Sequence, residues 1–255
     1  MAERIAKALA RAGLCSRREA ERWIAEGRVS VNGAVLATPA VTVGEADAIA
    51  VDGKPIPGAE PTRLWRYHKA KGLITSHSDP QGRPTVFANL PKSLPRVVSV
   101  GRLDFNSEGL LLLTNDGALA RHLEHPSTGW TRRYRVRAHG AADPKALERL
   151  ANGVTIEGVR YGPVDAKLES IKGDNTWLLF SLKEGKNREV RRLCEHLGLA
   201  VTRLIRVAYG PFQLGDLERG EVATVTPKQL TGQLGKAAEQ FRIGGEQHAH
   251  RRRTA

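Results

Sequence analysis

Residues 97–117 read Val-Val-Ser-Val-Gly-Arg-Leu-Asp-Phe-Asn-Ser-Glu-Gly-Leu-Leu-Leu-Leu-Thr-Asn-Asp-Gly. Two apolar runs, Val97–Val100 and Leu110–Thr114, have the length of strands and stand on either side of a polar loop. The second run is apolar up to its last residue, which is typical of a strand buried on both faces. The sequence therefore predicts a loop held between two buried strands, where a rigid scaffold can hold reacting groups.

Further strand-like and helical patterns stand on both sides of this loop. Strand-like runs cover residues 63–67, 133–138 and 176–182, and helical patterns cover residues 119–124, 144–150 and 187–197. Because they mix without a strict βαβ rhythm, we expect the α+β class, with a mainly antiparallel mixed sheet and flanking helices. This main domain is predicted to span residues 64–235.

The first 60 residues have a pattern of their own. Ser16 and Glu19 match a capping box at the start of the second of two short helices. Asn32-Gly33 then marks a tight hairpin, and Asp52-Gly53 marks a second such turn. A linker rich in proline follows at residues 55–61. The sequence therefore predicts a small separate domain with its linker over residues 1–60.

This arrangement resembles the S4 RNA-binding module. The resemblance covers Glu3–Gly33 and is strongest in Leu14–Ala20 and Val29–Gly33. It implies that basic side chains on the outer helix faces contact phosphates without reading bases; a solvated charged face is the alternative. The side chains concerned are Arg4, Lys7, Arg11, Arg17, Arg18 and Arg22.

The composition favours a nucleic acid as partner. The chain of 255 residues has 40 Lys and Arg against 27 Asp and Glu, a formal net charge of +13. No apolar run approaches the ~20 residues of a spanning helix, so a membrane is the weaker option. With no signal-peptide pattern and two cysteines without ligand spacing, we expect a cytoplasmic protein. Residues 239–255, which end in a basic cluster at Arg251–Arg253, are predicted to be a disordered arm.

Asp104 is the carboxylate whose position has no evident structural explanation. Other aspartates precede glycine or proline, follow glycine in a loop, or stand at a helix N-cap: Asp52, Asp79, Asp116, Asp143, Asp174 and Asp216. Asp104 stands in the loop between the two apolar strands. From composition alone, a turn-capping role for Asp104 is as plausible as a catalytic one.

A family resemblance favours the catalytic role. Gly101–Asp104, followed by Gly109–Gly117, resembles the signature of the RsuA and RluB branch of the pseudouridine synthases. Other stretches agree in order and spacing: Tyr67–Thr75, Gly82–Val86, Arg133–Val136, Leu182–Arg192, Arg203–Val207 and Gly210–Phe212. Two positions depart from the family pattern, namely Ala70 in place of proline and Glu189 where glutamine is common.

The resemblance implies an isomerisation of uridine in ribosomal RNA. Asp104 would be the catalytic carboxylate, as nucleophile or as a proton-abstracting base. Arg191 would hold its charge, and Tyr134 and Leu204 would lie against the two faces of the extruded uracil. Because the reaction involves no redox change and no net hydrolysis, no metal or cofactor is expected. Weaker candidates for phosphate or pocket contacts are Arg102, Lys69 and Arg203.

The target and the class of function stay open at this stage. The extended match and the basic tail favour large-subunit 23S ribosomal RNA over small-subunit 16S RNA. The expected partner is this RNA, either free or in a pre-ribosomal particle. We expect the chain to act as a monomer. A non-catalytic ribosome assembly factor that retains the fold is an alternative. An S4-bearing synthetase of the tyrosyl-tRNA type is a further one, although no nucleotide-binding motif is present.

Overall fold

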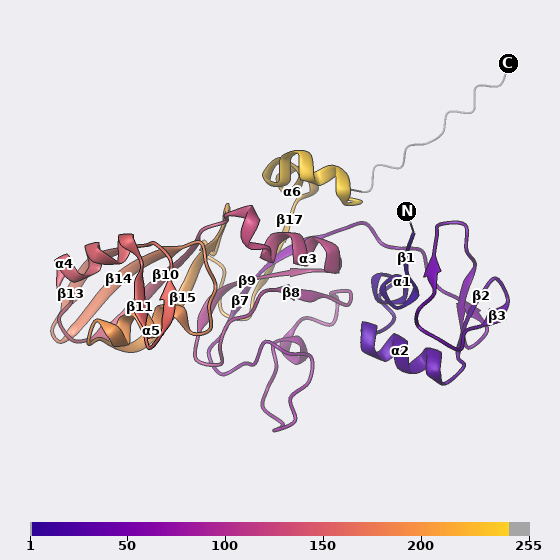
Figure 1. Cartoon of the computed structure of the whole chain (residues 1–255), viewed down its shortest axis with the longest axis horizontal. Helices are drawn as coiled ribbons and strands as arrows, with labels where there is room; N and C mark the ends of the chain where they lie inside the picture. The colour runs from indigo at the N-terminus through magenta and orange to yellow at the C-terminus, as the bar shows by residue number, and fades with distance from the viewer. Residues whose placement is uncertain (1, 245–255) are drawn as a thin grey trace, which may run out of the picture.

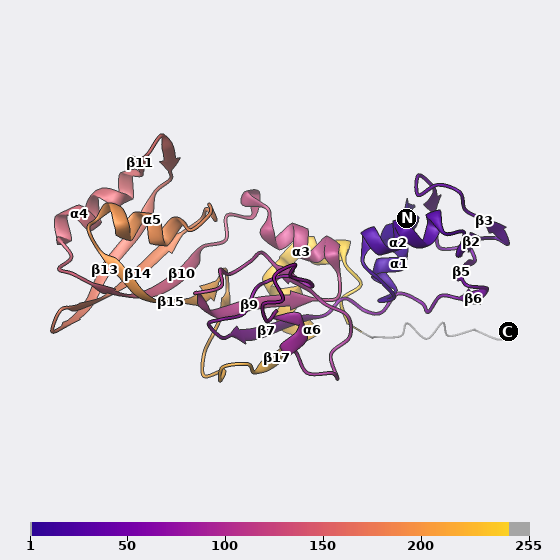
Figure 2. The same cartoon turned by 90° about the horizontal axis from the view of Figure 1, so that it is seen from below.

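The N-terminal domain consists of two short helices packed on small strands. The computed structural model describes residues 2–244, and this domain lies at one end of the molecule in both views (Figure 1, Figure 2). Its elements are β1 (Glu3–Arg4), α1 (Ile5–Arg11), α2 (Arg17–Ala25), β2 (Val29–Val31), β3 (Ala34–Val35), β4 (Thr42–Val43), β5 (Ile49–Val51) and β6 (Lys54–Pro55). The sheet runs in the order β3-β2-β5-β6, and β1 pairs with β4.

The predicted local signals of this domain are confirmed. The amide of Glu19 donates to Ser16 Oγ at 3.1 Å, and the amide of Ser16 donates to Glu19 Oε2 at 3.4 Å, which completes the capping box. Asn32 and Gly33 both have positive φ, as do Asp52 and Gly53, so both pairs form the expected tight hairpin turns. The short-range sequence pattern therefore correctly places the start of α2 and the two hairpin turns.

A nine-stranded sheet organises the main domain. Its path runs β13-β14-β10-β15-β9-β7-β17, with β16 beside β15 and β8 beside β9. The strands are β7 (Leu64–Lys69), β8 (Val98–Val100), β9 (Glu108–Thr114), β10 (Arg132–His139), β13 (Val164–Lys172), β14 (Asn175–Leu182), β15 (Ala200–Tyr209), β16 (Phe212–Gln213) and β17 (Val222–Val225). Every pairing in it is antiparallel except that of β9 with β15. The α+β prediction with a mainly antiparallel mixed sheet is confirmed.

Helices cover the two halves of this sheet. They are α3 (Gly117–Glu124), α4 (Pro144–Arg149), α5 (Glu189–His196) and α6 (Pro227–Leu234), with short 3₁₀ segments at Phe87–Asn89, Pro126–Thr128, Leu150–Asn152 and Gly235–Gln240. Helices α4 and α5 pack with β10 and β14 in one apolar core, whereas α3 and α6 pack with β7 and β9 in another. In the chain, α4 is followed by a hairpin of β11 (Val154–Ile156) and β12 (Val159–Tyr161). This hairpin lies at the end of the molecule opposite the N-terminal domain (Figure 2).

The two halves of the sheet meet along a short seam. Strands β9 and β15 pair only through Ile205 with Glu108 and Arg206 with Gly109. Gly109 has a φ of 105°, and a Cβ atom there would lie 2.3 Å from the Arg206 carbonyl oxygen. Glycine is therefore required for the backbones of β9 and β15 to approach each other this closely. The seam lies directly after the loop that carries Asp104.

Substitution of Gly109 by alanine is expected to destabilise the fold. The added methyl group would overlap the Arg206 backbone, so we expect a loss of about 3 kcal/mol, or roughly 6–12 °C in Tm. Gly173→Ala is a matched control, since its φ is also positive but nothing lies within 4 Å of the added atom. Thermal unfolding of both variants checks this, and equal Tm values would contradict it.

Parts of the fold extend beyond the sequence prediction. Strand β13 and the β11–β12 hairpin were not predicted. Residues 239–244, predicted to begin a disordered arm, instead belong to the main domain, because Phe241 and Ile243 pack against its core and Ile243 bridges to Thr62. The main domain therefore extends past the predicted boundary at residue 235, at least to Ile243. The rest of the predicted arm, residues 245–255 with Arg251–Arg253, lies outside the described residues.

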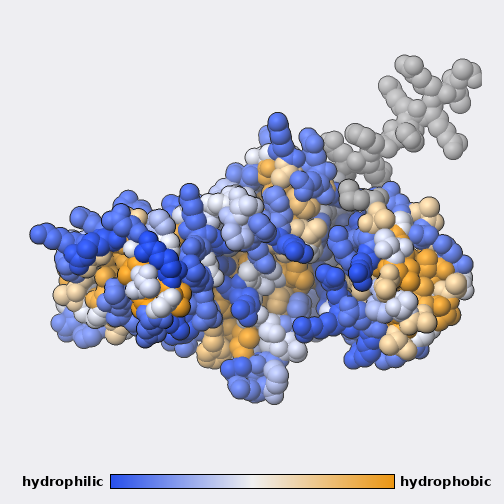
Figure 3. Space-filling model, in the orientation of Figure 1, coloured by the Kyte–Doolittle hydropathy of each residue, from blue (hydrophilic) through white to orange (hydrophobic). Residues whose placement is uncertain are grey.

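Hydrophilic side chains cover most of the face shown in Figure 3. Apolar surface gathers at the end formed by the N-terminal domain, where Val35 is 65% exposed. Within residues 2–244, none of the helices has the length and apolar character needed to cross a membrane.

Candidate active site

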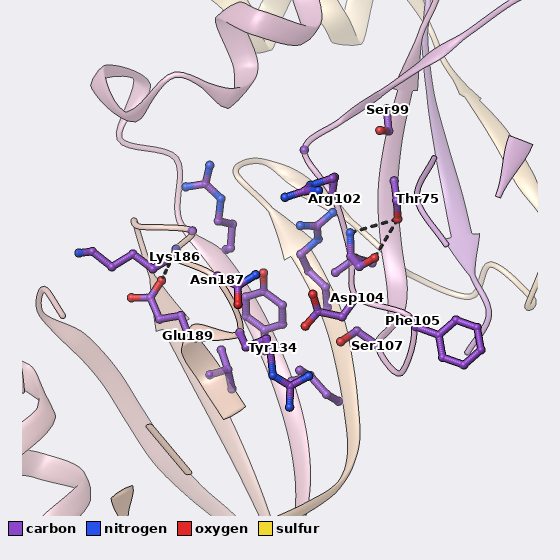
Figure 4. A pocket seen from close by; sticks show the side chains of 18 of the residues that line it. Thr75, Ser99, Arg102, Asp104, Phe105, Ser107, Tyr134, Lys186, Asn187 and Glu189 are labelled. Atoms are coloured by element: carbon purple, nitrogen blue, oxygen red, sulfur yellow. Dashed lines mark hydrogen bonds between the residues drawn. The ribbon is translucent and has the colours of Figure 1, made fainter. Parts of the chain in front are cut away.

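A cavity of about 710 Å³ opens beside the loop of residues 101–107 (Figure 4). Strands β10 and β15 and the segment before α5 form its other walls. Basic side chains in its lining outnumber acidic ones: Arg83, Arg102, Arg132, Lys186, Arg188 and Arg206 stand against Asp104, Glu124 and Glu189. Such a lining favours an anionic ligand.

The carboxylate of Asp104 is free within this cavity. The residue is half-buried and points toward Tyr134 (Figure 4). Within the described part of the chain, its side-chain oxygens accept no hydrogen bond and form no ion pair. Asp104 does not cap a turn through its side chain, so the turn-capping alternative has no support in the structure. The carboxylate is available to a ligand.

The backbone that carries Asp104 is held at every residue. Five consecutive carbonyl oxygens each accept a hydrogen bond from another segment: Leu103 from Thr75 Oγ1 (2.8 Å), Asp104 from Lys69 Nζ (3.1 Å), Phe105 from the Gly72 amide (2.8 Å), Asn106 from Arg191 Nη2 (2.8 Å) and Ser107 from Lys69 Nζ (2.9 Å). The loop is thereby ordered before any ligand arrives, which is the preorganisation that a catalytic group needs.

Lys69 lies behind the loop rather than in the cavity. Its side chain is fully buried, and its ammonium group donates to the carbonyl oxygens of Ala70, Asp104 and Ser107. Burial lowers the pKa of Lys69 to about 8, although the charges of Asp104 and Glu108 oppose that shift. To contact substrate as predicted, the ammonium group of Lys69 would have to break its hydrogen bonds to three carbonyl oxygens. Its position is that of a residue that anchors the loop.

Arg191 approaches the same loop from α5. It is 9% exposed, and its Nη2 donates to the Asn106 carbonyl at 2.8 Å. Burial and the charge of Arg188 lower the pKa of Arg191, whereas the charge of Asp104 raises it. The predicted fork to the Asp104 carboxylate is not formed in the described residues. Arg191 instead holds the loop backbone through the Asn106 carbonyl.

Tyr134 and Leu204, the residues expected to contact the uracil, both lie in the cavity wall. Tyr134 lies on β10, and Leu204 pairs with Val136 two residues farther along that strand. The two side chains therefore share one face of the sheet, and both line the cavity. Tyr134 also packs against the apolar cores on both sides of the seam. An aromatic ring beside a free carboxylate can stack against a planar base.

Arg203, a weaker candidate for substrate contact, points away from the cavity and is absent from its lining. It alternates with Leu204 along β15, so its side chain lies on the opposite face. Its Nε and Nη2 donate to the two carboxylate oxygens of Glu108 at 2.8 and 3.1 Å, and Arg219 Nη2 lies 3.3 Å from Glu108 Oε2. Arg203 lowers the pKa of Glu108. This ion pair joins β15 to β9 at the seam.

Arg102 lines the cavity as an exposed side chain, and its contact with substrate stays a prediction. Arg206 was missed, although it is 2% exposed and lines the cavity two residues after Leu204. The alternation of strand residues could have identified Arg206, because residues two apart share a face. Glu189 was also missed as a lining residue; it is 4% exposed, and burial raises its pKa.

The predicted basic face of the N-terminal domain divides into paired and unpaired side chains. Lys7 and Arg11 form ion pairs with Glu3, and Arg22 forms ion pairs with Glu19 and Glu26. The side chains without an acidic partner in the described residues are Arg4, Arg17 and Arg18, all exposed. Those three are the basic groups of this face most available to an anionic partner.

No group of three or more His, Cys, Asp or Glu residues in positions 2–244 could hold a metal ion.

Comparison with known protein families identifies two segments. The model of the RNA pseudouridylate synthase family matches residues 63–196, and that of the S4 domain matches residues 3–49. A solved structure described as a pseudouridylate synthase is similar with a TM-score of 0.63 and 26% identity, over 90% of this chain and 99% of that chain.

Named relatives agree with these matches. A protein of Rickettsia bellii named as an uncharacterized RNA pseudouridine synthase is 49% identical over 226 residues, which are 89% of this chain and 98% of that protein. The ribosomal large subunit pseudouridine synthase B of Pseudomonas aeruginosa is 44% identical over 240 residues, which are 89% of this chain but 61% of that protein. That of Yersinia pestis is 45% identical over 84% of this chain and 69% of that protein.

Proposed function

The chain belongs to the RNA pseudouridylate synthase family, and from that premise we propose that it converts one uridine of 23S ribosomal RNA into pseudouridine with Asp104 as the catalytic carboxylate. It is an isomerase with an S4 domain at its N-terminus. The observation that carries the residue assignment is the unpaired Asp104 carboxylate, which points toward Tyr134 in a cavity rich in basic groups.

The choice of large-subunit RNA follows from the relatives. The proteins of Pseudomonas aeruginosa and Yersinia pestis, named for the ribosomal large subunit, match most of this chain, including both of its domains. Small-subunit 16S RNA is the second candidate. A non-catalytic binder is disfavoured, because a fully anchored loop that presents an unpaired carboxylate has no evident use in binding an anion.

The reaction exchanges one bond of the nucleotide for another. The bond between C1′ and N1 breaks, the uracil turns, C5 bonds to C1′, the proton on C5 leaves, and N1 takes up a proton. A uridine in folded RNA must leave its stack to reach Asp104, and this costs a few kcal/mol. Contact of the uracil with Tyr134 on one face and Leu204 on the other offsets that cost. Asp104 acts either as a nucleophile or as a base and is regenerated in both cases.

Charged groups around Asp104 have separate tasks in this scheme. Arg191 holds the Asn106 carbonyl and brings a positive charge near the Asp104 carboxylate without occupying its oxygens. Arg102 and Arg188 are exposed in the cavity lining without an acidic partner in the described residues, so both can contact the phosphates of the extruded nucleotide. Lys186 pairs with Glu184, and Arg132 donates to the Lys183 carbonyl. The carboxylate therefore faces an RNA strand without strong repulsion from its backbone.

The exposed arginines of the N-terminal domain are expected to anchor a neighbouring RNA helix. Replacing Arg17 and Arg18 together by alanine should weaken RNA binding and reduce the slope of log affinity against log salt by about 2, since each phosphate contact contributes about 0.9. Replacing Lys7 and Arg11 is the control, because Glu3 already engages both. Salt titrations of RNA affinity check this, and equal slopes for the two double variants would contradict it.

The target assignment is tested by mapping pseudouridines in ribosomal RNA. Carbodiimide treatment followed by primer extension stops at pseudouridines, and RNA from cells with and without this protein is compared. We expect one stop in 23S RNA to disappear with the protein. Loss of a stop only in 16S RNA would favour the second candidate, and no change in either RNA would refute both.

A further inference from the structure

Phe105 is an exposed aromatic side chain directly after Asp104. It is 41% exposed, whereas Leu103 is 6% and Ser107 is 2% exposed on the same loop. The other large apolar side chains exposed in residues 2–244 are aliphatic and lie outside the cavity lining: Leu14, Val35, Val159, Leu168 and Ile171. The one exposed phenyl ring of the described residues therefore stands next to the catalytic carboxylate.

The ring has no structural role that accounts for its position. Within the described range it belongs to no apolar core cluster, and it makes no ring–ring or cation–π contact. Leu103, by contrast, belongs to the core beneath the loop. Exposing a phenyl ring to water forgoes the free energy of burying it, and a ligand that covers the ring would recover part of that free energy.

The backbone at Phe105 is fixed. Its carbonyl oxygen accepts a hydrogen bond from the Gly72 amide at 2.8 Å, and the carbonyls on either side are held by Lys69 and Arg191. The ring is thus presented by an anchored loop and not by a loose one. A side chain with two χ angles on such a loop loses little entropy when it is covered.

Phe105 and Asp104 point to different sides of the loop. In Figure 4 the Asp104 carboxylate faces Tyr134, while the Phe105 ring extends in the opposite direction, and both residues line the cavity. An RNA strand that delivers a nucleotide to Asp104 must continue past the loop. Arg102, on the same loop, offers a cation to its phosphates.

We propose that Phe105 is a stacking platform for an unpaired nucleobase adjacent to the modified uridine, an inference that rests on the function proposed above. Stacking on an aromatic ring tolerates any base, because every base has a π-face. The ring would hold the neighbouring nucleotide in place while the uridine is extruded toward Asp104.

The test compares three substitutions on a 23S RNA fragment that the wild-type enzyme binds. Phe105→Ala is expected to weaken affinity by about 5- to 150-fold, the range measured for loss of one stacked base. Phe105→Tyr should retain affinity, and Phe105→Leu should lose most of it, because leucine keeps apolar area but has no π-face. Ile171→Ala, which removes a 57% exposed side chain of β13, is the matched control and should bind as wild type.

Two further readouts separate stacking from a structural role. The loss in Phe105→Ala should be the same at all salt concentrations, since no phosphate contact is removed. The Tm of Phe105→Ala should equal that of the wild type, because the ring belongs to no apolar core cluster of the described residues. Unchanged affinity for Phe105→Ala, or full affinity for Phe105→Leu, would overturn the proposal.

The outcome is distinguishable from failure of the proposed function. If the wild-type enzyme forms no pseudouridine in ribosomal RNA, the function fails, while the binding series still decides whether Phe105 stacks. If the enzyme is active and the modified uridine is mapped, removing the base next to that uridine should abolish the difference between wild type and Phe105→Ala. A difference that persists on the abasic RNA would overturn the proposal.

Discussion

Replacement of Asp104 by asparagine is expected to lower kcat by roughly 10⁴-fold or more, because the variant has neither a nucleophilic nor a basic carboxylate. The change is nearly isosteric, and the Asp104 side chain makes no hydrogen bond or ion pair in the described residues that the amide would lose. RNA affinity should therefore stay within a few-fold of wild type, and so should Tm. Single-turnover formation of pseudouridine and RNA binding are the measurements.

Asp174→Asn is the matched control for this substitution. Asp174 stands in the turn between β13 and β14, outside the cavity lining, so its variant should turn over as wild type. Substantial pseudouridine formation by Asp104→Asn would show that another group performs the chemistry. Loss of RNA affinity as large as the loss of kcat would show that Asp104 serves binding instead.

Replacement of Lys69 by methionine is expected to lower kcat by on the order of 100-fold while leaving RNA affinity nearly unchanged. The variant removes the donor that holds the carbonyls of Asp104 and Ser107, and each buried carbonyl left without a donor costs about 1–3 kcal/mol. Removing a buried cation relieves a desolvation penalty of similar size, so Tm should change little. A misplaced carboxylate, and not an unfolded protein, accounts for the expected loss.

Hydrogen exchange reports the same effect in the loop itself. Amides of residues 103–107 should exchange faster in Lys69→Met, while those of β9 stay protected. Lys172→Met, which replaces an exposed lysine at the end of β13, is the control and should leave both kcat and exchange unchanged. Wild-type kcat in Lys69→Met would contradict the anchoring role.

Titration of Lys69 is expected to lower kcat and to raise the free energy of unfolding as the pH rises above neutral. Its pKa in the folded protein is about 8, below its ordinary value of 10.5. As pH rises through about 8, the ammonium loses its charge and one donor, so kcat should fall. Between about pH 8 and pH 10.5, Lys69 is protonated more in the unfolded chain than in the folded chain. It therefore makes the free energy of unfolding rise with pH in that range. A kcat that is flat from pH 7 to 9.5 would contradict this.

The sequence predicts those parts of the fold that depend on local pattern. The capping box at Ser16, the two hairpin turns and the buried strand Leu110–Thr114 were all found, because each depends on residues a few positions apart. Strand β13 was missed, since most of its residues are exposed at the edge of the sheet and it shows little apolar alternation. The packed segment 239–244 was missed because its contacts are with distant core residues.

In the candidate site, too, residues that belong to sequence motifs could be predicted, whereas environments that depend on long-range pairing could not. Asp104 and Tyr134 were found through sequence motifs, and the structure brings them together. The environments of Lys69 and Arg203 could not be predicted, because their partners depend on how distant strands pair. Lys69 meets a carbonyl 38 residues away, and Arg203 meets Glu108 from 95 residues away. A basic residue in a motif can equally contact RNA or anchor a loop until that pairing is known.

Release of tritium from ribosomal RNA labelled with [5-³H]uridine tests the central claim most directly, because the proton on C5 leaves only when C5 bonds to C1′. The RNA is taken from cells that lack this protein and is incubated with wild-type enzyme or with Asp104→Asn. We predict stoichiometric release from 23S RNA with the wild type and background release with the variant. Background release with both proteins on every ribosomal RNA fragment, or equal release with both, would contradict the assignment of Asp104 and its cavity as the site of pseudouridine formation.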